Sequence, residues 1–434
     1  MSWESLSEEQ RNAVTYSGRH LLVKGFSGTG KTTVLTARAK FLQDAGVPSE
    51  KIITLSPATI DRITCQRLEA AGIEHILIDE VQDLTPPQRM SLQSLASHCD
   101  LFCVGDETQS INSYNGADWR SIRRFTLDFP GTEVMTLTKN FRNTQEIQDL
   151  AIWLLKQSPM DYRIEVPQAR CAGQVPLLFC SKEKYNLYDA IAEDIKRNVT
   201  QYGYRYEDHL LLAREEGDLY GPRISLTRRG VPCLGPETIQ QKRYQGDHIK
   251  RLITPLVRYS DTDTGPDPGS ALAEARKRLE ESLQPDSYIF KERYQKEYDE
   301  LQELANQAQT VRQFFRLLEE HSVVVKKTRY KNDNCIGIET IRNTKAREAE
   351  ICYLWDITRL RWPSFDERWD PDQVEEARRS LSLGITRARS KVVILCADYP
   401  FCLQKTRSKI LFFFLREVGT RVELIDSFEE KRKK

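Results

Sequence analysis

The sequence has no long apolar run and no excess of one charge. No stretch reaches the ~18–20 apolar residues of a membrane span, and the first ten residues, MSWESLSEEQ, lack the basic and apolar regions of a signal peptide. Lysine and arginine number 64, against 63 aspartates and glutamates. We therefore expect a cytoplasmic protein with no membrane partner, in which local clusters of charge would hold any nucleic acid.

The sequence also lacks paired cysteines and internal repeats. Its ten cysteines are scattered, and none forms a CxxC pair, which argues against a disulfide framework. Cys99 and Cys103 lie close together beside His98, but a structural zinc site needs four converging ligands and no second pair is present. We therefore do not expect zinc.

Short apolar runs alternate with helical patterns along the chain. Such runs are typical of strands buried on both faces of a parallel sheet. We expect an α/β fold of two tandem RecA-like P-loop NTPase cores, with a small helical insertion in the second. The expected strands are HLLVKG, KIITLS, HILIDE and LFCVGD in the first core, and QVPLLFC, HLLLAR, CIGIET, EICYLWD and KVVILCA in the second.

The predicted domain bounds follow from this alternation. The first core covers 1–136, and the second covers 137–262 and 327–434. The loop-like stretch YSDTDTGPDPGS begins at residue 259, and charged segments with helical spacing follow it, so 263–326 is predicted as the insertion. A solvated helical hairpin with no site of its own is the alternative for that segment.

A phosphate-binding loop is the strongest local motif. Residues 25–33 read GFSGTGKTT, which fits GxxxxGK[ST] between a strand and a helix. Backbone N–H groups and the helix N-terminus would hold phosphate, Lys31 would reach the outer phosphates, and the Thr32 hydroxyl would ligate Mg²⁺. A glycine-rich turn without nucleotide is the alternative. The predicted ATP-binding residues here are Gly25, Phe26, Ser27, Gly28, Thr29, Gly30, Lys31, Thr32 and Thr33.

Two acids follow the apolar strand HILI. Asp79 is placed to hold Mg²⁺, and Glu80 to accept a proton from an attacking water. Acids often simply end a strand, so this pair alone would be weak evidence for a catalytic site. The pair lies about 50 residues downstream of the phosphate loop, and the two motifs together predict hydrolysis of a nucleoside triphosphate.

The motif DEVQD (79–83) resembles motif II of the UvrD/Rep/PcrA group of superfamily-one helicases. Five further segments resemble family motifs in the expected order: LSEEQRNAV, VGDETQSI, LTKNFRNT, TIRNTKAREAE and ARRSLSLGITRAR. The resemblance implies two cores that close on ATP, with catalytic groups from both. It also implies that the motor moves along single-stranded DNA with 3′ to 5′ polarity.

The resemblance also assigns roles to single residues. It places Gln10 at the adenine, Phe141 stacked on it, and Glu348 at the ribose. Gln109 would sense the γ-phosphate, Arg142 would contact it, and Arg387 would act as the arginine finger. A surface salt bridge is the alternative for either arginine.

The sequence departs from the family at the DNA contacts and insertions. Ser56 and Thr59 are the remaining phosphate-binding candidates in motif Ia, Tyr114 could stack on a base, and Arg342 replaces a histidine. In KARE, Ala346 replaces a glycine of the family motif. A tyrosine capping the sheet edge is the alternative for Tyr114. The family's first-core insertion is absent, and the second is short.

These observations predict an ATP hydrolase that acts as a translocase or helicase on single-stranded or tailed duplex DNA. The trimmed insertions leave a second interpretation open, an ATP-switched DNA-binding subunit that works with a nuclease or other subunit, as in bacterial anti-phage defence. An NTPase that acts on no nucleic acid is the third. DNA-dependent ATP turnover distinguishes the third from the others.

Overall fold

A five-stranded parallel sheet forms the first core. The computed structural model describes residues 5–113, 116–181, 184–233, 252–256, 259, 265–282, 288–321, 334–344, 347–355, 370–397 and 421–425. The strands are β1 (His20–Gly25), β2 (Ile52–Leu55), β3 (His75–Ile78), β4 (Asp100–Gly105) and β5 (Thr132–Leu137), in the order β2-β3-β4-β1-β5. Because β1, β3 and β4 are parallel and in register, their carboxyl ends meet at one edge of the sheet.

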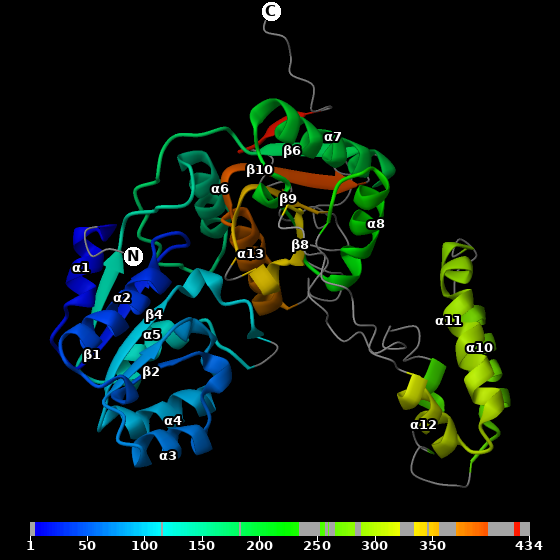
Figure 1. The fold of residues 1–434 in the computed structure, drawn as a ribbon, viewed down its shortest axis with the longest axis horizontal. Coiled ribbons are helices and arrows are strands. Elements are labelled where there is room, and N and C mark those ends of the chain that lie inside the picture. Colours follow the sequence, from blue (N-terminus) through cyan, green and yellow to red (C-terminus); the bar gives the residue numbers. More distant parts are fainter. Residues whose placement is uncertain are drawn as a thin grey trace, which may run out of the picture. The chain divides into compact units, whose positions relative to one another are not determined.

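Helices cover both faces of this sheet (Figure 1). Apolar side chains of α1 (Glu8–Val14) and α2 (Lys31–Asp44) pack on one face. Those of α3 (Arg62–Ala70), α4 (Pro86–Ala96) and α5 (Ser121–Asp128) pack on the other. Burial on both faces explains why the strands are apolar without alternation. Four short 3-10 helices complete this core: η2 (Ser49–Lys51), η3 (Pro57–Thr59), η4 (Val81–Asp83) and η5 (Glu107–Gln109).

The second core has a six-stranded parallel sheet in the order β11-β6-β10-β9-β7-β8. Helices α6 (Gln145–Lys156) and α13 (Pro371–Ile385) pack on one face, and α7 (Lys184–Tyr202) and α8 (Tyr220–Arg228) on the other. The strands are β6 (Leu177–Ser181), β7 (His209–Ala213), β8 (Gly337–Thr340), β9 (Ala349–Leu354), β10 (Ala388–Ala397) and β11 (Glu423–Ile425). The short helices are η7 (Tyr206–Asp208), η8 (Glu216–Asp218) and η9 (Ile341–Thr344).

The prediction of two parallel α/β cores is confirmed, and every predicted strand is present. Sequence reasoning missed β5 and β11. Strand β5 pairs only with β1 at the edge of its sheet, and most of its residues are partly or fully exposed, so it has no continuous apolar run. Strand β11 has only three residues.

Residues Pro236–Lys331 form a separate compact unit. It contains α10 (Pro268–Ser282), α11 (Tyr288–Gln307) and α12 (Val311–His321), so the expected helical segment is present. Its apolar core includes Leu256, Leu272, Leu301 and Phe314, all nearly inaccessible to solvent. This unit therefore has its own core, and the narrower bounds 263–326 stay a prediction.

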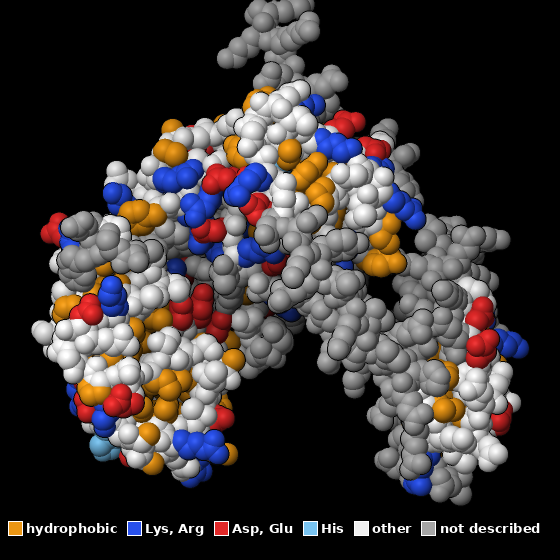
Figure 2. Space-filling model, viewed as in Figure 1, with side chains coloured by type: hydrophobic (Ala, Val, Ile, Leu, Met, Phe, Trp, Pro, Cys, Tyr) orange, Lys and Arg blue, Asp and Glu red, His pale blue; other side chains and the backbone are white. Residues whose placement is uncertain are grey.

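The described surface carries both charges. On the face seen in Figure 2, Lys and Arg side chains are interspersed with Asp and Glu. A nucleic-acid contact on the visible face would therefore depend on particular groups rather than on a broad basic surface.

None of the helices in the described part of the chain is both long and apolar enough to span a membrane.

A buried polar network ties α7 to the second sheet. Asp194 on α7 accepts hydrogen bonds from the Lys391 ammonium, at 2.8 and 2.9 Å, and from the Tyr353 hydroxyl, at 2.6 Å. The Asn198 amide donates to the same carboxylate at 3.3 Å. The side chain of Asp194 is only 4% exposed, so its charge relies on these partners.

We expect Lys391→Met to lower the free energy of unfolding by about 3 kcal/mol, because it leaves a buried carboxylate without its cation. Urea denaturation followed by circular dichroism measures the loss. Lys196→Met is the control, since Lys196 is an exposed lysine on α7, the helix that carries Asp194. This change should alter the free energy of unfolding by about 0.5 kcal/mol or less. Equal stability of the two variants would contradict the role given to the network.

Candidate functional site

The loop after β1 is shaped by two glycines with positive φ. Gly28 has φ 84° and Gly30 has φ 85°, a region that disfavours other residues. A Cβ on Gly28 would also collide with the Asn140 side chain, and one on Gly30 with that of Gln10. The loop then passes directly into α2, which begins at Lys31. This is the strand, loop and helix arrangement that the sequence predicts for phosphate binding.

Lys31 is folded onto its own loop. Its ammonium donates to the carbonyls of Gly25, at 2.8 Å, and Phe26, at 3.2 Å, and lies 3.7 Å from the Asp106 carboxylate. The side chain is 8% exposed. Asp106 follows β4, and sequence reasoning did not single it out, although its place after an apolar strand in VGDETQ is a usable signal. Asp106 thus links the loop to the segment that carries Gln109.

The two residues proposed for Mg²⁺ lie in contact. The Thr32 hydroxyl donates to the Asp79 carboxylate at 2.9 Å. Burial, and then the charge of Glu80, raise the pKa of Asp79, so a cation beside this carboxylate would relieve an existing cost. A hydroxyl and a carboxylate are hard oxygen donors of the kind that Mg²⁺ prefers. The residues present therefore fit the ion.

Glu80 occupies a strained backbone position. Its φ of 57° makes it the single non-glycine residue with positive φ in the described part of the chain. The carboxylate lines the cleft and accepts a hydrogen bond from the Gln82 amide. Residues held in such conformations cluster at functional sites, because the surrounding structure must impose them.

Two arginines of the second core meet the phosphate loop of the first. The Ser27 hydroxyl accepts from Arg142, at 3.0 Å, and from Arg387, at 2.8 Å. Arg387 is 1% exposed and also donates to the Thr344 carbonyl at 3.2 Å. Burial first, and then repulsion by Arg142, lower the pKa of Arg387 to about 9. Both guanidinium groups therefore face the loop, where an anion would offset their repulsion.

A carboxylate pairs with Arg142 and with a third arginine of the second core. Glu348 accepts from Arg142 and from Arg389. Burial raises the pKa of Glu348, but the attraction of the two guanidinium groups outweighs it, so its pKa lies below the usual value. Sequence reasoning missed Arg389. The TRAR spacing is a signal for it, because residues two apart on an extended segment share a side.

A single cleft of about 250 Å³ gathers most of the predicted residues. It contains cationic groups from both cores, the Glu80 carboxylate, and the Phe141 ring, which is 38% exposed. Phe141 also lies under the Lys139 ammonium, 5.4 Å from the ring centre. The lining residues are Ser27, Gly28, Gly30, Lys31, Thr32, Thr33, Glu80, Gln109, Phe141, Arg142, Glu348, Arg387 and Arg389.

Several predicted nucleotide-binding residues do not line this cleft. Gln10 is 3% exposed, and its amide donates to the Thr29 carbonyl while its side-chain oxygen accepts from the Ser7 N–H. Thr29 is fully buried. In this arrangement Gln10 holds the phosphate loop through the Thr29 carbonyl and does not line the cleft.

The described candidates for DNA contact, Ser56, Thr59 and Arg342, do not line this cleft. Ser56 and Thr59 are exposed around η3, where the Thr59 hydroxyl donates to the Ser56 carbonyl at 2.8 Å. Arg342 lies 3.4 Å from the Glu376 carboxylate. Tyr114 and Ala346 lie outside the described residues.

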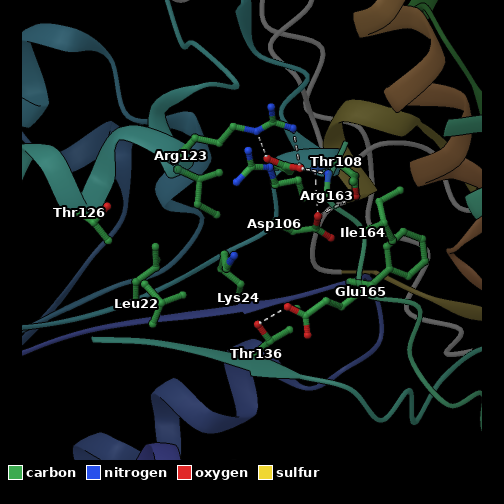
Figure 3. A pocket seen from close by; sticks show the side chains of 15 residues that line it. Leu22, Lys24, Asp106, Thr108, Arg123, Thr126, Thr136, Arg163, Ile164 and Glu165 are labelled. Atoms are coloured by element: carbon green, nitrogen blue, oxygen red, sulfur yellow. Dashed lines mark hydrogen bonds and ion pairs between the residues drawn. The ribbon is translucent and has the colours of Figure 1, made fainter. Parts of the chain in front are cut away.

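A second cavity, of about 190 Å³, lies on the other side of the phosphate loop. Gly25 and Phe26 line it, together with the Asp106–Thr108 segment and α5. Figure 3 shows Arg123 among the side chains that line this cavity. Its guanidinium donates to the Glu107 carboxylate at 2.7 and 3.1 Å. The segment that carries Gln109 is thus held from this side by α5.

Comparison with known proteins finds similarity to DNA helicases over parts of the chain. Residues 64–130 match the model of the UvrD/REP helicase N-terminal domain. The chain is 37% identical over 186 residues to a protein named "Putative ATP-dependent DNA helicase YjcD" of Bacillus subtilis, which is 43% of this chain and 24% of that protein. It is 31% identical over 166 residues to the ATP-dependent DNA helicase srs2 of Schizosaccharomyces pombe, covering 37% of this chain and 18% of the relative.

A third relative is the ATP-dependent DNA helicase UvrD1 of Mycobacterium tuberculosis, 25% identical over 166 residues, or 36% of this chain and 22% of that protein. The chain thus spans about a quarter or less of the length of each of these relatives. The family match and these relatives show that parts of this chain are similar to DNA helicases of the UvrD/REP type.

Proposed function

We propose that this chain is an ATP-driven motor on single-stranded DNA, a 3′ to 5′ translocase or helicase of UvrD type. One observation carries the proposal. The cleft is lined by Lys31, Glu80 and Gln109 from the first core, and by guanidinium groups from the second. Such a site is complete only when both cores contribute, so closing and reopening of the cores would accompany each ATP cycle.

The roles follow from the chemistry of each group. Lys31 and the N–H groups at the start of α2 would hold the phosphates, and Glu80 would accept a proton from the attacking water. Arg142 and Arg387 would neutralise charge on the transferred phosphoryl group. Thr32 and Asp79 would hold Mg²⁺, which supplies further charge neutralisation when bound.

The base and the sugar have their own candidates. The exposed Phe141 ring would stack on the adenine, and Glu348 would accept from a ribose hydroxyl. The hydrogen bonds from Arg142 and Arg389 to Glu348 would then break. Gln10 would act near the adenine through the phosphate loop that it supports.

DNA would contact exposed hydroxyls and cations of both cores. Ser56 and Thr59 are the candidates on the first core, with Tyr114 as a stacking residue, and Arg342 is the candidate on the second. Strand displacement tests the motor. Wild-type protein with ATP should release streptavidin from a biotinylated, 3′-tailed duplex, and Glu80→Gln should not. Binding without displacement would contradict a motor.

The second candidate is an ATP-switched DNA-binding subunit of a larger complex, for example with a nuclease in anti-phage defence. The short connection between β2 and β3, which contains only η3 and α3, favours it. Duplex-engaging parts would then belong to a partner. Displacement that begins only when a partner subunit is added would support this candidate over a stand-alone motor.

We also expect Arg387→Gln to bind nucleotide more weakly than the wild type. The buried guanidinium faces the phosphate loop and donates to Ser27, and glutamine removes its charge. The dissociation constant of a non-hydrolysable ATP analogue, measured at pH 8 for both proteins, tests this expectation. Equal dissociation constants would contradict the assignment of Arg387 to the phosphate site.

A further inference from the structure

One side of α13 carries three polar residues that contact the segment after β4. Asp372, Glu376 and Arg379 are spaced by four and three residues, so they share a side of the helix. Asp372 lies 3.6 Å from Arg120, and Glu376 accepts from the Ser113 hydroxyl. The first contact is largely exposed and contributes little stability. The contact made by Arg379 is buried, so it restricts the position of α13 more than the Asp372 contact does.

Arg379 is held in one position. It is 2% exposed, and its Nε–H donates to the Ser110 carbonyl at 2.6 Å. One terminal nitrogen donates to the Tyr162 hydroxyl at 2.7 Å. Charge-assisted bonds of this length are strong, and the planar guanidinium can make both only in a fixed orientation. A movement of α13 would therefore carry the Ser110 carbonyl with it.

The two ends of this link belong to the candidate site. Ser110 directly follows Gln109, which lines the cleft and donates to Asp106 at 2.7 Å. At the other end, α13 ends at Ile385, two residues before Arg387. Arg379 lies six residues before that end, about 9 Å along the helix. One helix thus joins the Gln109 segment to Arg387.

The same side of α13 reaches a candidate DNA contact. Glu376, which is 7% exposed, accepts from Ser113 and lies 3.4 Å from Arg342. Arg342 follows β8 in η9. A DNA phosphate that attracted Arg342 would compete with Glu376 for this arginine. The attraction between Arg342 and α13 would then weaken one turn before Arg379.

A second arginine holds the Gln109 segment without involving α13. Arg123 on α5 donates to the Glu107 carboxylate through two nitrogens. It belongs to the first core, like Glu107 itself. The segment is therefore held by two arginines, and only Arg379 comes from the helix that leads to Arg387. This provides a matched control.

We propose that Arg379 is a positioning residue that couples the Gln109 segment to Arg387 through α13, so that DNA contact and ATP turnover depend on each other. This inference rests on the proposed function. Arg379 is not one of the residues that line the cleft, and it donates to Ser110 and Tyr162. Its removal should therefore weaken the response to DNA more than the binding of ATP.

ATP turnover of Arg379→Lys and Arg123→Gln, measured over a range of single-stranded DNA concentrations, tests the proposal. Lysine keeps the charge but cannot make both hydrogen bonds. Arg379→Lys should lower DNA-stimulated kcat by about tenfold or more and leave the KM for ATP within about twofold. Arg123→Gln should keep its stimulation within about threefold of wild type. Wild-type stimulation in Arg379→Lys, or an equal loss in Arg123→Gln, would overturn the proposal.

Glu376→Gln provides a second test if Arg379→Lys does not fold, because the amide preserves the shape of a carboxylate one turn away. It should also lower stimulation by DNA, and wild-type stimulation would count against the proposal. A wild-type protein that single-stranded DNA does not stimulate would overturn the proposed function together with this coupling. A stimulated wild type with an equally stimulated Arg379→Lys would overturn the coupling alone.

Discussion

Replacing Arg387 with alanine should lower the DNA-stimulated rate of ATP hydrolysis by about 10³-fold or more. The guanidinium is 1% exposed, it donates to Ser27 in the phosphate loop, and no alanine side chain can replace its charge there. Charge that develops on the transferred phosphoryl group would then lack a preorganised partner in a site shielded from water. Steady-state phosphate release with saturating DNA measures the effect.

Arg389→Ala is the control for this experiment. Arg389 lines the same cleft two residues further on, but it bonds Glu348 and makes no hydrogen bond to the phosphate loop within the described residues. Its loss should reduce turnover by about 100-fold or less, because one hydrogen bond to a charged group contributes about 1.5–3 kcal/mol. If both variants lost the same activity, general disturbance of the cleft would explain the result better than a finger role for Arg387.

Replacing Glu80 with glutamine should lower kcat by about 10²- to 10⁴-fold and leave ATP binding intact. The amide keeps the size of the carboxylate and its place in the strained turn, but it cannot accept a proton from water at neutral pH. Rapid-quench measurement of a single turnover, with binding of a fluorescent ATP analogue measured in parallel, separates chemistry from affinity.

Lys31→Ala is the companion variant, because it should weaken binding as well as turnover. Lys31 supplies a fixed cation at the phosphate loop, and Glu80 supplies none. If Glu80→Gln weakened analogue binding as strongly as Lys31→Ala, Glu80 would be serving as a binding or structural group. A Glu80→Gln protein that hydrolysed ATP at the wild-type rate would exclude it as the base.

The fold and the phosphate loop were predictable because their signals are local. Buried parallel strands produce continuous apolar runs, and the loop needs its glycines, lysine and threonine within nine residues. Edge strand β5 gave no such signal, because few of its side chains are buried. The local rule thus succeeds where burial is complete.

The contacts between distant segments could not be predicted in the same way. That Ser27 would receive both Arg142 and Arg387 depends on how two cores pack, which no local spacing encodes. Arg379 was overlooked for the same reason, since its spacing from Glu376 only indicates a shared helix side. The roles of all the site residues, Gln10 and the DNA-contact residues among them, stay predictions.

Steady-state ATP turnover of the wild-type protein, with and without single-stranded DNA, decides whether the chain is a DNA-dependent motor. We expect turnover to rise many-fold with DNA, because the catalytic groups come from two cores that also carry the candidate DNA contacts. A turnover rate that was the same at every DNA concentration would contradict it.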